Sequence, residues 1–144
     1  VEAALARTRL IVVALAGGVL FLAAVSGFVD FGGDGAVGRM LSLPAGLAGL
    51  VALVVGWRLF MTMRDRAADV EEVETGIQRY SAALLMALAL TEGVAFVGVV
   101  AYLLGGTLVS LTGVVTHVLL TGILWPAGEK IRPFLGRAGR HYTE

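Results

Sequence analysis

Cysteine is absent from the 144-residue sequence, so disulfide bonds, thiol nucleophiles and thiolate metal sites are excluded. Histidine occurs twice, as His117 and His141, which is too few for a metal cluster with the usual ligand spacing. The sequence also has no phosphate-binding glycine loop and no nucleophile elbow. We therefore expect a protein that is not an enzyme and that needs no metal or other cofactor.

Charge is also scarce. Charged residues make up 15% of the chain and hydrophobic residues 58%, with a mean hydropathy of +0.88, whereas about a quarter of a soluble domain is charged. The formal net charge is zero and the basic residues flank apolar blocks, so nucleic acid is not an expected partner. The expected surroundings are a lipid bilayer.

Apolar residues gather in four blocks, at about 10–29, 41–60, 81–104 and 107–125. Each block is close to the ~20 residues that cross the hydrocarbon core of a membrane. Such blocks must be helical there, because lipid offers no partners for backbone N–H and C=O groups. The sequence therefore predicts an all-α integral membrane protein, with four transmembrane helices in two antiparallel hairpins within a single domain at 1–144.

Basic residues predict the orientation of these helices. All but one lie before the first block, around the facing ends of the second and third blocks, or after the fourth: Arg7, Arg9, Arg58, Arg64, Arg66, Arg79, Lys130, Arg132, Arg137 and Arg140. Arg39 alone falls in the first outer connection. By the positive-inside rule, the N-terminus, the central loop and the C-terminus are cytoplasmic.

The connections between blocks differ in length and polarity. The first, at 30–42, is glycine-rich, which predicts a flexible turn. Pro44 follows it and is suited to the first turn of the second helix. The central segment at 64–79 is polar with apolar residues at helical spacing, which fits either a short surface helix or a cytoplasmic extension of a span. The polar side of this segment is either a solvated face or a surface on which a partner docks.

The last connection is only Gly105-Gly106, which predicts a tight hairpin between the third and fourth helices. The tail at 126–144 mixes apolar and basic residues after Trp125 and suits an interfacial segment. Small residues repeat at helical spacing on the second helix, which favours close helix packing. The expected packing glycines are Gly49, Gly56, Gly93 and Gly113, although glycine is abundant throughout the chain, with 20 residues.

Glu92 stands in the middle of the third block, far from any other charge. A carboxylate at this depth costs a few kcal/mol to insert and usually faces a bundle interior or an ion pathway. We expect Glu92 to be buried, protonated at neutral pH when no cation is bound, and to bind a proton or cation. The alternative is a neutral acid that only fixes helix packing.

His117 is the second candidate. It shares a helical face with Ser110, Gly113 and Thr121, and Thr91 adjoins Glu92 as a further supporting polar residue. At ~1.5 Å per residue, Glu92 and His117 lie at similar distances from the Gly105-Gly106 turn, about 20 and 17 Å. We therefore expect their side chains to meet within the hairpin. The alternative is that His117 is an ordinary packing residue.

The segment 83–97, with Thr91-Glu92-Gly93 at its centre, resembles the carboxylate-bearing helix of subunit c, the proteolipid of F- and V-type rotary ATPases. In that family the carboxylate binds the transported proton or sodium ion, which corresponds to Glu92 here. The alternating-glycine helix of a c-ring is missing, and Glu92 lies on the third helix. The segment from Trp125 to Pro133 is similar to uncharacterised bacterial four-helix membrane proteins, distant relatives of subunit c.

The resemblance implies a multi-pass protein of the bacterial plasma membrane that forms a homo-oligomer or joins other membrane subunits, with Glu92 as its ion- or proton-binding residue. The depth of His117 in the fourth helix, and not the resemblance, makes it the second candidate for this role. The alternative is a structural accessory subunit of an energy-converting membrane complex, in which both residues only fix packing. A transporter or channel would need more polar residues along a path than this sequence has.

The charge distribution generates a topology prediction. Single cysteines placed at Glu2 and His141 should both react with a membrane-impermeant maleimide only from the cytoplasmic side, because the basic residues hold both ends there. The cysteine-free chain makes each label unambiguous. Labelling of the two ends from opposite sides would contradict an even number of spans.

Overall fold

The computed structural model describes residues 2–29, 35–68, 72–127 and 129, which form helices joined by short connections. The all-α expectation is confirmed. The elements are α1 (Glu2–Ser26), α2 (Ala36–Ala68), α3 (Val73–Leu103), the 3-10 helix η1 (Leu108–Leu111) and α4 (Thr112–Ile123).

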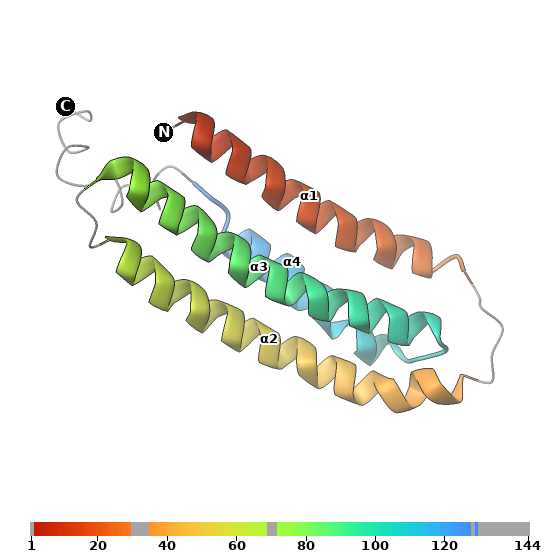
Figure 1. Ribbon diagram of the computed structural model, residues 1–144. Helices are drawn as coiled ribbons and strands as arrows, with labels where there is room; N and C mark the ends of the chain where they lie inside the picture. The colour runs from red at the N-terminus through yellow and green to blue at the C-terminus, as the bar shows by residue number, and fades with distance from the viewer. Residues whose placement is uncertain (1, 30–34, 69–71, 128, 130–144) are drawn as a thin grey trace.

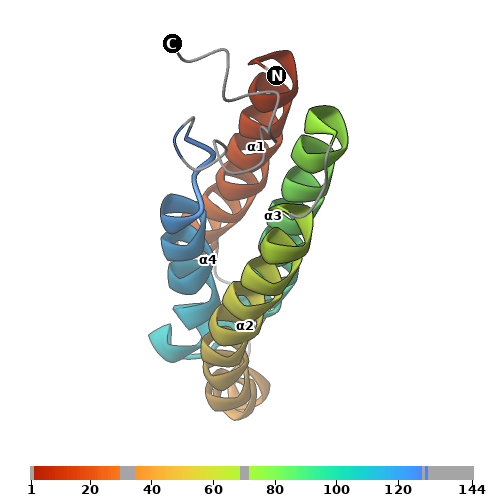
Figure 2. The same cartoon turned by 90° about the vertical axis from the view of Figure 1, so that its left-hand side faces the viewer.

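Three long helices form a layer, and the fourth lies on one side of it. α1 and α2 flank α3 in Figure 1, and Figure 2 shows α4 beside this layer. α1 runs parallel to α3, since Thr8 bonds Ser81 at one end and Val19 packs near Ala95 and Val99 further along. α3 contacts α1, α2 and α4, whereas α1 packs on α3 and less extensively on α4. α3 is therefore the central helix.

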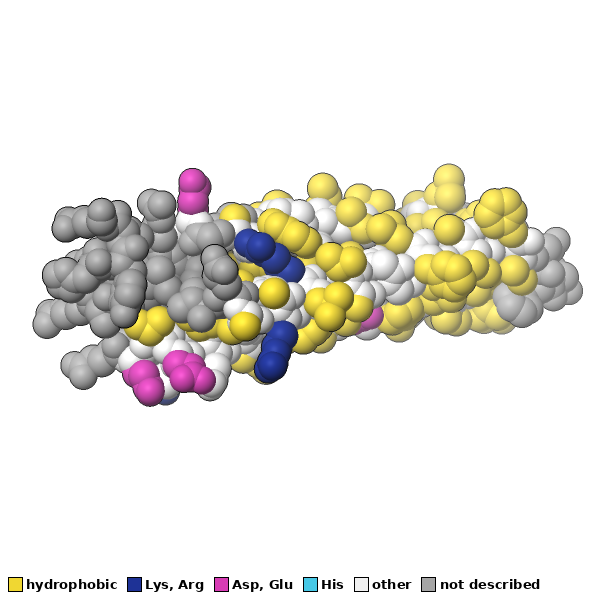
Figure 3. Space-filling view, turned by 90° about the horizontal axis from the view of Figure 1, so that it is seen from above, with side chains coloured by type: hydrophobic (Ala, Val, Ile, Leu, Met, Phe, Trp, Pro, Cys, Tyr) yellow, Lys and Arg dark blue, Asp and Glu magenta, His cyan; other side chains and the backbone are white. Residues whose placement is uncertain are grey.

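The outer surface of this bundle is apolar. α1, α2 and α3 are each long and apolar enough to cross a membrane, and Leu108–Ile123 forms a shorter apolar helix. On the face drawn in Figure 3, hydrophobic side chains gather along the described helices and charged ones lie mainly toward one end. In the most apolar window of α1 only 17% of the residues are buried, against 44% in α3. Such a surface belongs in lipid, and the chain is a multi-pass helical membrane protein.

α2 and α3 are longer than the expected spans, because they extend through much of the central polar segment. With 33 and 31 residues, they measure ~50 and ~46 Å against a hydrocarbon core of ~30 Å. Ala67 and Ile77 of this extension are buried in the main core cluster, and at its base the rings of Phe60 and Tyr80 lie edge-to-face at 5.8 Å. Of the two readings of 64–79, the structure supports the extension of a span.

Pro44 lies inside α2, not at its first turn as expected. The helix begins earlier because tertiary contacts hold its first turns. Ser42 Oγ donates to the Gly38 carbonyl at 2.8 Å and accepts the backbone N–H of Thr107 at 2.8 Å. An interior proline loses one helical hydrogen bond, which membrane helices tolerate.

Two of the expected packing glycines meet each other where α2 crosses the start of α4. A Cβ added to Gly49 would lie 2.6 Å from the backbone nitrogen of Gly113 and 2.9 Å from its Cα. Further along α2, a Cβ on Gly56 would approach Leu120, the Ala87 carbonyl and Thr91 at 3.2–3.4 Å. Backbone-to-backbone contact of this kind requires glycine. The tail at 130–144 lies outside the described residues.

Gly49→Ala should lower the unfolding free energy in mixed detergent micelles by about 1–3 kcal/mol, because the added methyl meets backbone atoms that cannot rotate away. Gly17→Ala is the matched control, since a Cβ at Gly17 meets nothing within 4 Å. It should leave stability unchanged or raise it by less than about 1 kcal/mol. Equal effects of the two substitutions would contradict the close contact of α2 and α4.

Candidate functional site

Glu92 lies halfway along the membrane-spanning part of α3. The hydroxyls of Thr8 and Ser81 are 3.0 Å apart and, with the bond from Arg9 Nε to the Pro126 carbonyl at 3.1 Å, mark one level of the bundle. At ~1.5 Å per residue, Glu92 is ~16 Å beyond Ser81 and a similar distance before Leu103. Its depth agrees with the sequence-based estimate.

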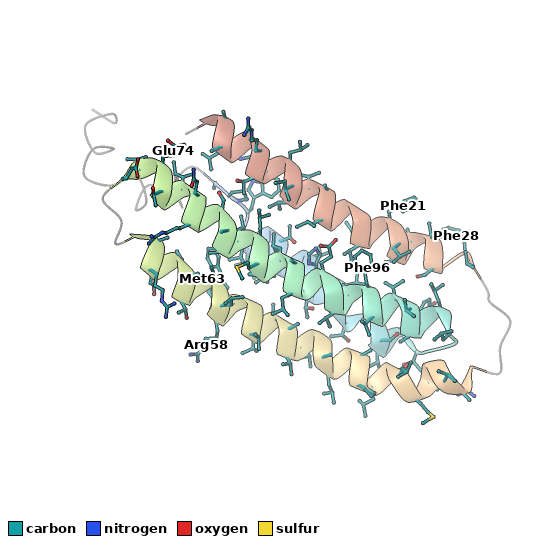
Figure 4. The ribbon with its side chains drawn as sticks, viewed as in Figure 1. Phe21, Phe28, Arg58, Met63, Glu74 and Phe96 are labelled. Carbon is teal, nitrogen blue, oxygen red and sulfur yellow. The ribbon has the colours of Figure 1, made fainter. Side chains whose placement is uncertain are left out.

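The Glu92 side chain points to the α1 side of α3. Four residues further along, Phe96 is on the same side and lies between α3 and α1 in Figure 4, where it packs against the buried cluster that contains Val19 of α1. α1 is apolar from Leu10 to Val25 and provides no hydrogen-bonding side chain at this depth. Within the described part of the chain, the Glu92 carboxyl has no hydrogen bond or ion pair.

The expectation that Glu92 is buried is wrong: its side chain is only partly covered. The fully buried polar residues of this region are Thr91, on the neighbouring face of α3, and His117. The reason is rotational. Successive helix residues are about 100° apart, so the face that places Thr91 against α4 turns Glu92 toward the edge of the bundle. Depth could be read from the sequence, whereas this rotation could not.

Thr91 and His117 form the one polar link between α3 and α4 that the described side chains make. Thr91 Oγ1 and His117 Nδ1 are 2.8 Å apart, and Thr91 Oγ1 also lies 3.0 Å from the Leu88 carbonyl. Thr91 has one proton to donate. If it goes to Leu88, His117 donates from Nδ1 and its Nε2 is an acceptor; otherwise Nε2 carries the proton.

In either tautomer His117 Nε2 is buried without a hydrogen-bond partner. An unsatisfied buried nitrogen costs about 1–3 kcal/mol. His117 therefore has an unused polar atom in the dry centre of the bundle, where α2, α3 and α4 converge. Neither nitrogen of the ring bonds Glu92: the expected pairing of Glu92 and His117 is replaced by the pair of His117 with Thr91.

The remaining expected site residues bond their own backbone. Ser110 Oγ donates to the Thr107 carbonyl at 2.7 Å, and Thr121 Oγ1 donates to the His117 carbonyl at 2.8 Å. Neither hydroxyl supports the imidazole ring or Glu92. Gly93, expected at a helix contact, is exposed, and a Cβ there would meet nothing within 4 Å. No described residue packs closely against Gly93.

Three further polar contacts were not predicted from the sequence. They are Thr8 with Ser81, Ser42 with Thr107, and Arg9 with Pro126, and they join segments far apart in the chain near the two ends of the bundle. Serines and threonines near the ends of apolar blocks are the signal that could have pointed to them. No cluster of three or more His, Asp or Glu side chains suited to a metal ion occurs in the ranges that the structure describes.

The site therefore consists of two separate polar groups at neighbouring positions of α3: a closed Thr91–His117 pair inside the bundle and an unpaired carboxyl at its edge. The carboxyl can hold or release a proton, or pair with a group brought by another molecule. Comparison with known proteins finds no matching family model, curated protein or solved structure.

The Thr91–His117 contact generates a stability prediction. Thr91→Val should cost about 1–3 kcal/mol, because it leaves Nδ1 as well as Nε2 without a partner. Combined with His117→Leu it should be non-additive, with a coupling of about 0.5 kcal/mol or more in a double-mutant cycle. The matched control is Thr116→Val, whose buried hydroxyl bonds the Gly113 carbonyl of its own helix. Strict additivity in the Thr91–His117 cycle would remove the link.

Proposed function

We propose that this protein is a proteolipid-like subunit of a bacterial plasma-membrane assembly, in which Glu92 is the proton- or cation-binding group. The observation that carries the proposal is the unpaired Glu92 carboxyl, halfway along α3 and partly exposed at the α1 side. An ionisable side chain at this depth costs free energy to insert into the membrane, and such side chains are usually functional.

The position of Glu92 at an edge supports a role that involves a second molecule. A carboxyl sealed inside four helices would need a path through the chain, and the buried hydroxyls near the centre of the bundle are few and already bond backbone carbonyls. A carboxyl at the edge can exchange its proton or cation with a group on an adjacent subunit. The resemblance of 83–97 to the subunit c helix agrees with this role.

A second candidate is a structural accessory subunit of an energy-converting complex. The Thr91–His117 pair favours it, because this pair lies wholly within the chain and holds α3 against α4 without any exposed group. In that case Glu92 would contribute only to packing against a neighbour. The particle obtained by mild solubilisation separates the two: a symmetric homo-oligomer favours the proteolipid-like role and a lone copy among unrelated subunits the accessory role.

Glu92 in liposomes should react with a hydrophobic carbodiimide, which attacks protonated carboxyls within lipid. Peptide mass spectrometry should find the adduct on Glu92, and Glu92→Gln should remove it. Glu72 and Glu74 are internal controls, since both are exposed near the start of α3 beyond the level of Ser81. An adduct on these two residues with none on Glu92, or one that persists in Glu92→Gln, would contradict the proposed role.

A further inference from the structure

One surface of α3 has no partner among the residues that the structure describes. α1 and α2 flank α3, and α4 covers one side of the layer they form (Figures 1 and 2). The other side exposes apolar or small residues near Glu92, which we call the open face: Ala89, Gly93, Val97 and Val100. Val97 is 61% and Val100 51% exposed.

Glu92 borders the open face and is surrounded by unusually little side-chain bulk. A Cβ at Gly93 would meet nothing within 4 Å. Gly18 of α1 lies ~15 Å beyond Thr8, at nearly the depth of Glu92, and a Cβ there would also meet nothing within 4 Å. Another helix can therefore approach α3 closely at the depth of the carboxyl, which is how glycine acts in membrane helix pairs.

We propose that the open face binds the open face of a second copy of this chain, with the two Glu92 carboxyls hydrogen-bonded to each other across a two-fold axis. This inference rests on the proposed function, since it names the partner that Glu92 meets. A carboxylic acid is self-complementary, because its O–H donates to the carbonyl oxygen of an identical group.

The depth of Glu92 in the membrane favours the Glu92 of a second copy as its partner over the other residues of that copy. Two copies in the same orientation, related by an axis along the membrane normal, bring residues of equal depth together. The outward faces of α1 and α3 offer no basic side chain at the depth of Glu92. On α2, Arg58 points away from the bundle (Figure 4), and it lies toward the end of the bundle marked by Arg9 and Ser81. The group of a second copy that meets Glu92 at equal depth is therefore its own Glu92.

Oxidative cross-linking tests the pairing, and the cysteine-free sequence makes each disulfide unambiguous. Gly93→Cys in liposomes should form a covalent dimer, because the added side chain has space and sits beside the proposed axis. Val54→Cys is the depth-matched control. Val54 is 60% exposed and stands on the outward side of α2, one turn from Arg58, at the depth of Thr91, because Gly56 of α2 lies against Ala87 and Thr91. It should cross-link much more slowly.

A second change tests the carboxyl itself. Glu92→Leu in the Gly93→Cys background should slow cross-linking about fivefold or more, as expected for loss of a hydrogen bond between membrane helices. Glu92→Gln should largely preserve it, because the side-chain amide is also self-complementary. The Thr91–His117 pair lies outside this face, so the thermal stability of each variant in dilute detergent reports whether the bundle remains folded.

Equal rates at Gly93→Cys and Val54→Cys, or an unchanged rate in Glu92→Leu, would overturn the pairing. So would a photo-cross-linker at Val97 that captures only a different membrane protein in native membranes. If the dimer is absent while carbodiimide still labels Glu92, the inference fails and the proposed function stands. If carbodiimide leaves Glu92 unmodified in both monomer and dimer, the proposed function fails.

Discussion

The contact between the backbones of α2 and α4 at Gly49 and Gly113 is the constraint on which the rest of the structure depends. Lipid is as apolar as a leucine side chain, so helices in a membrane gain little from burying apolar surface against each other. What they gain instead is close contact, and glycine allows the closest. Once Gly49 lies against Gly113, α4 is held beside both α2 and α3, because Gly113 also lies next to Val94 and Ala95 of α3.

That constraint sets the rotation of α3 and thereby divides its polar residues into two kinds. Thr91 faces α4 and bonds His117, so its polarity is satisfied within the chain. Glu92 is turned toward α1, which carries no polar group at that depth, and its carboxyl is left unpaired. A carboxyl that is costly in lipid and has no partner among the described residues is suited to a partner on a second molecule, whereas a satisfied pair explains only how the helices of the bundle are held together.

α1 differs from the other helices in how it is held. Its buried residues Leu5 and Val12 join the main core cluster with α3, Thr8 bonds Ser81, and Val19 joins a smaller cluster further along. Most of its apolar window faces outward. Such a helix can cover one side of Glu92 without sealing it, which leaves the carboxyl partly exposed at the edge of the bundle.

Composition and block length were enough to predict the membrane environment, the all-α class and the apolar centre of each helix, because a backbone in lipid has few alternatives to a helix. They did not predict where α2 and α3 begin and end. The depth of Glu92 and the hairpin at Gly105-Gly106 also followed from the sequence, since both depend on residue spacing. Tertiary contacts decided the rest. The bond from the Thr107 N–H to Ser42 ties the first turns of α2, ahead of Pro44, to the segment before α4, and the packing of α3 against α4 selected Thr91 instead of Glu92 as the partner of His117. Spacing along a chain measures distance along a helix axis, whereas rotation about that axis is set by the neighbours against which the helix packs.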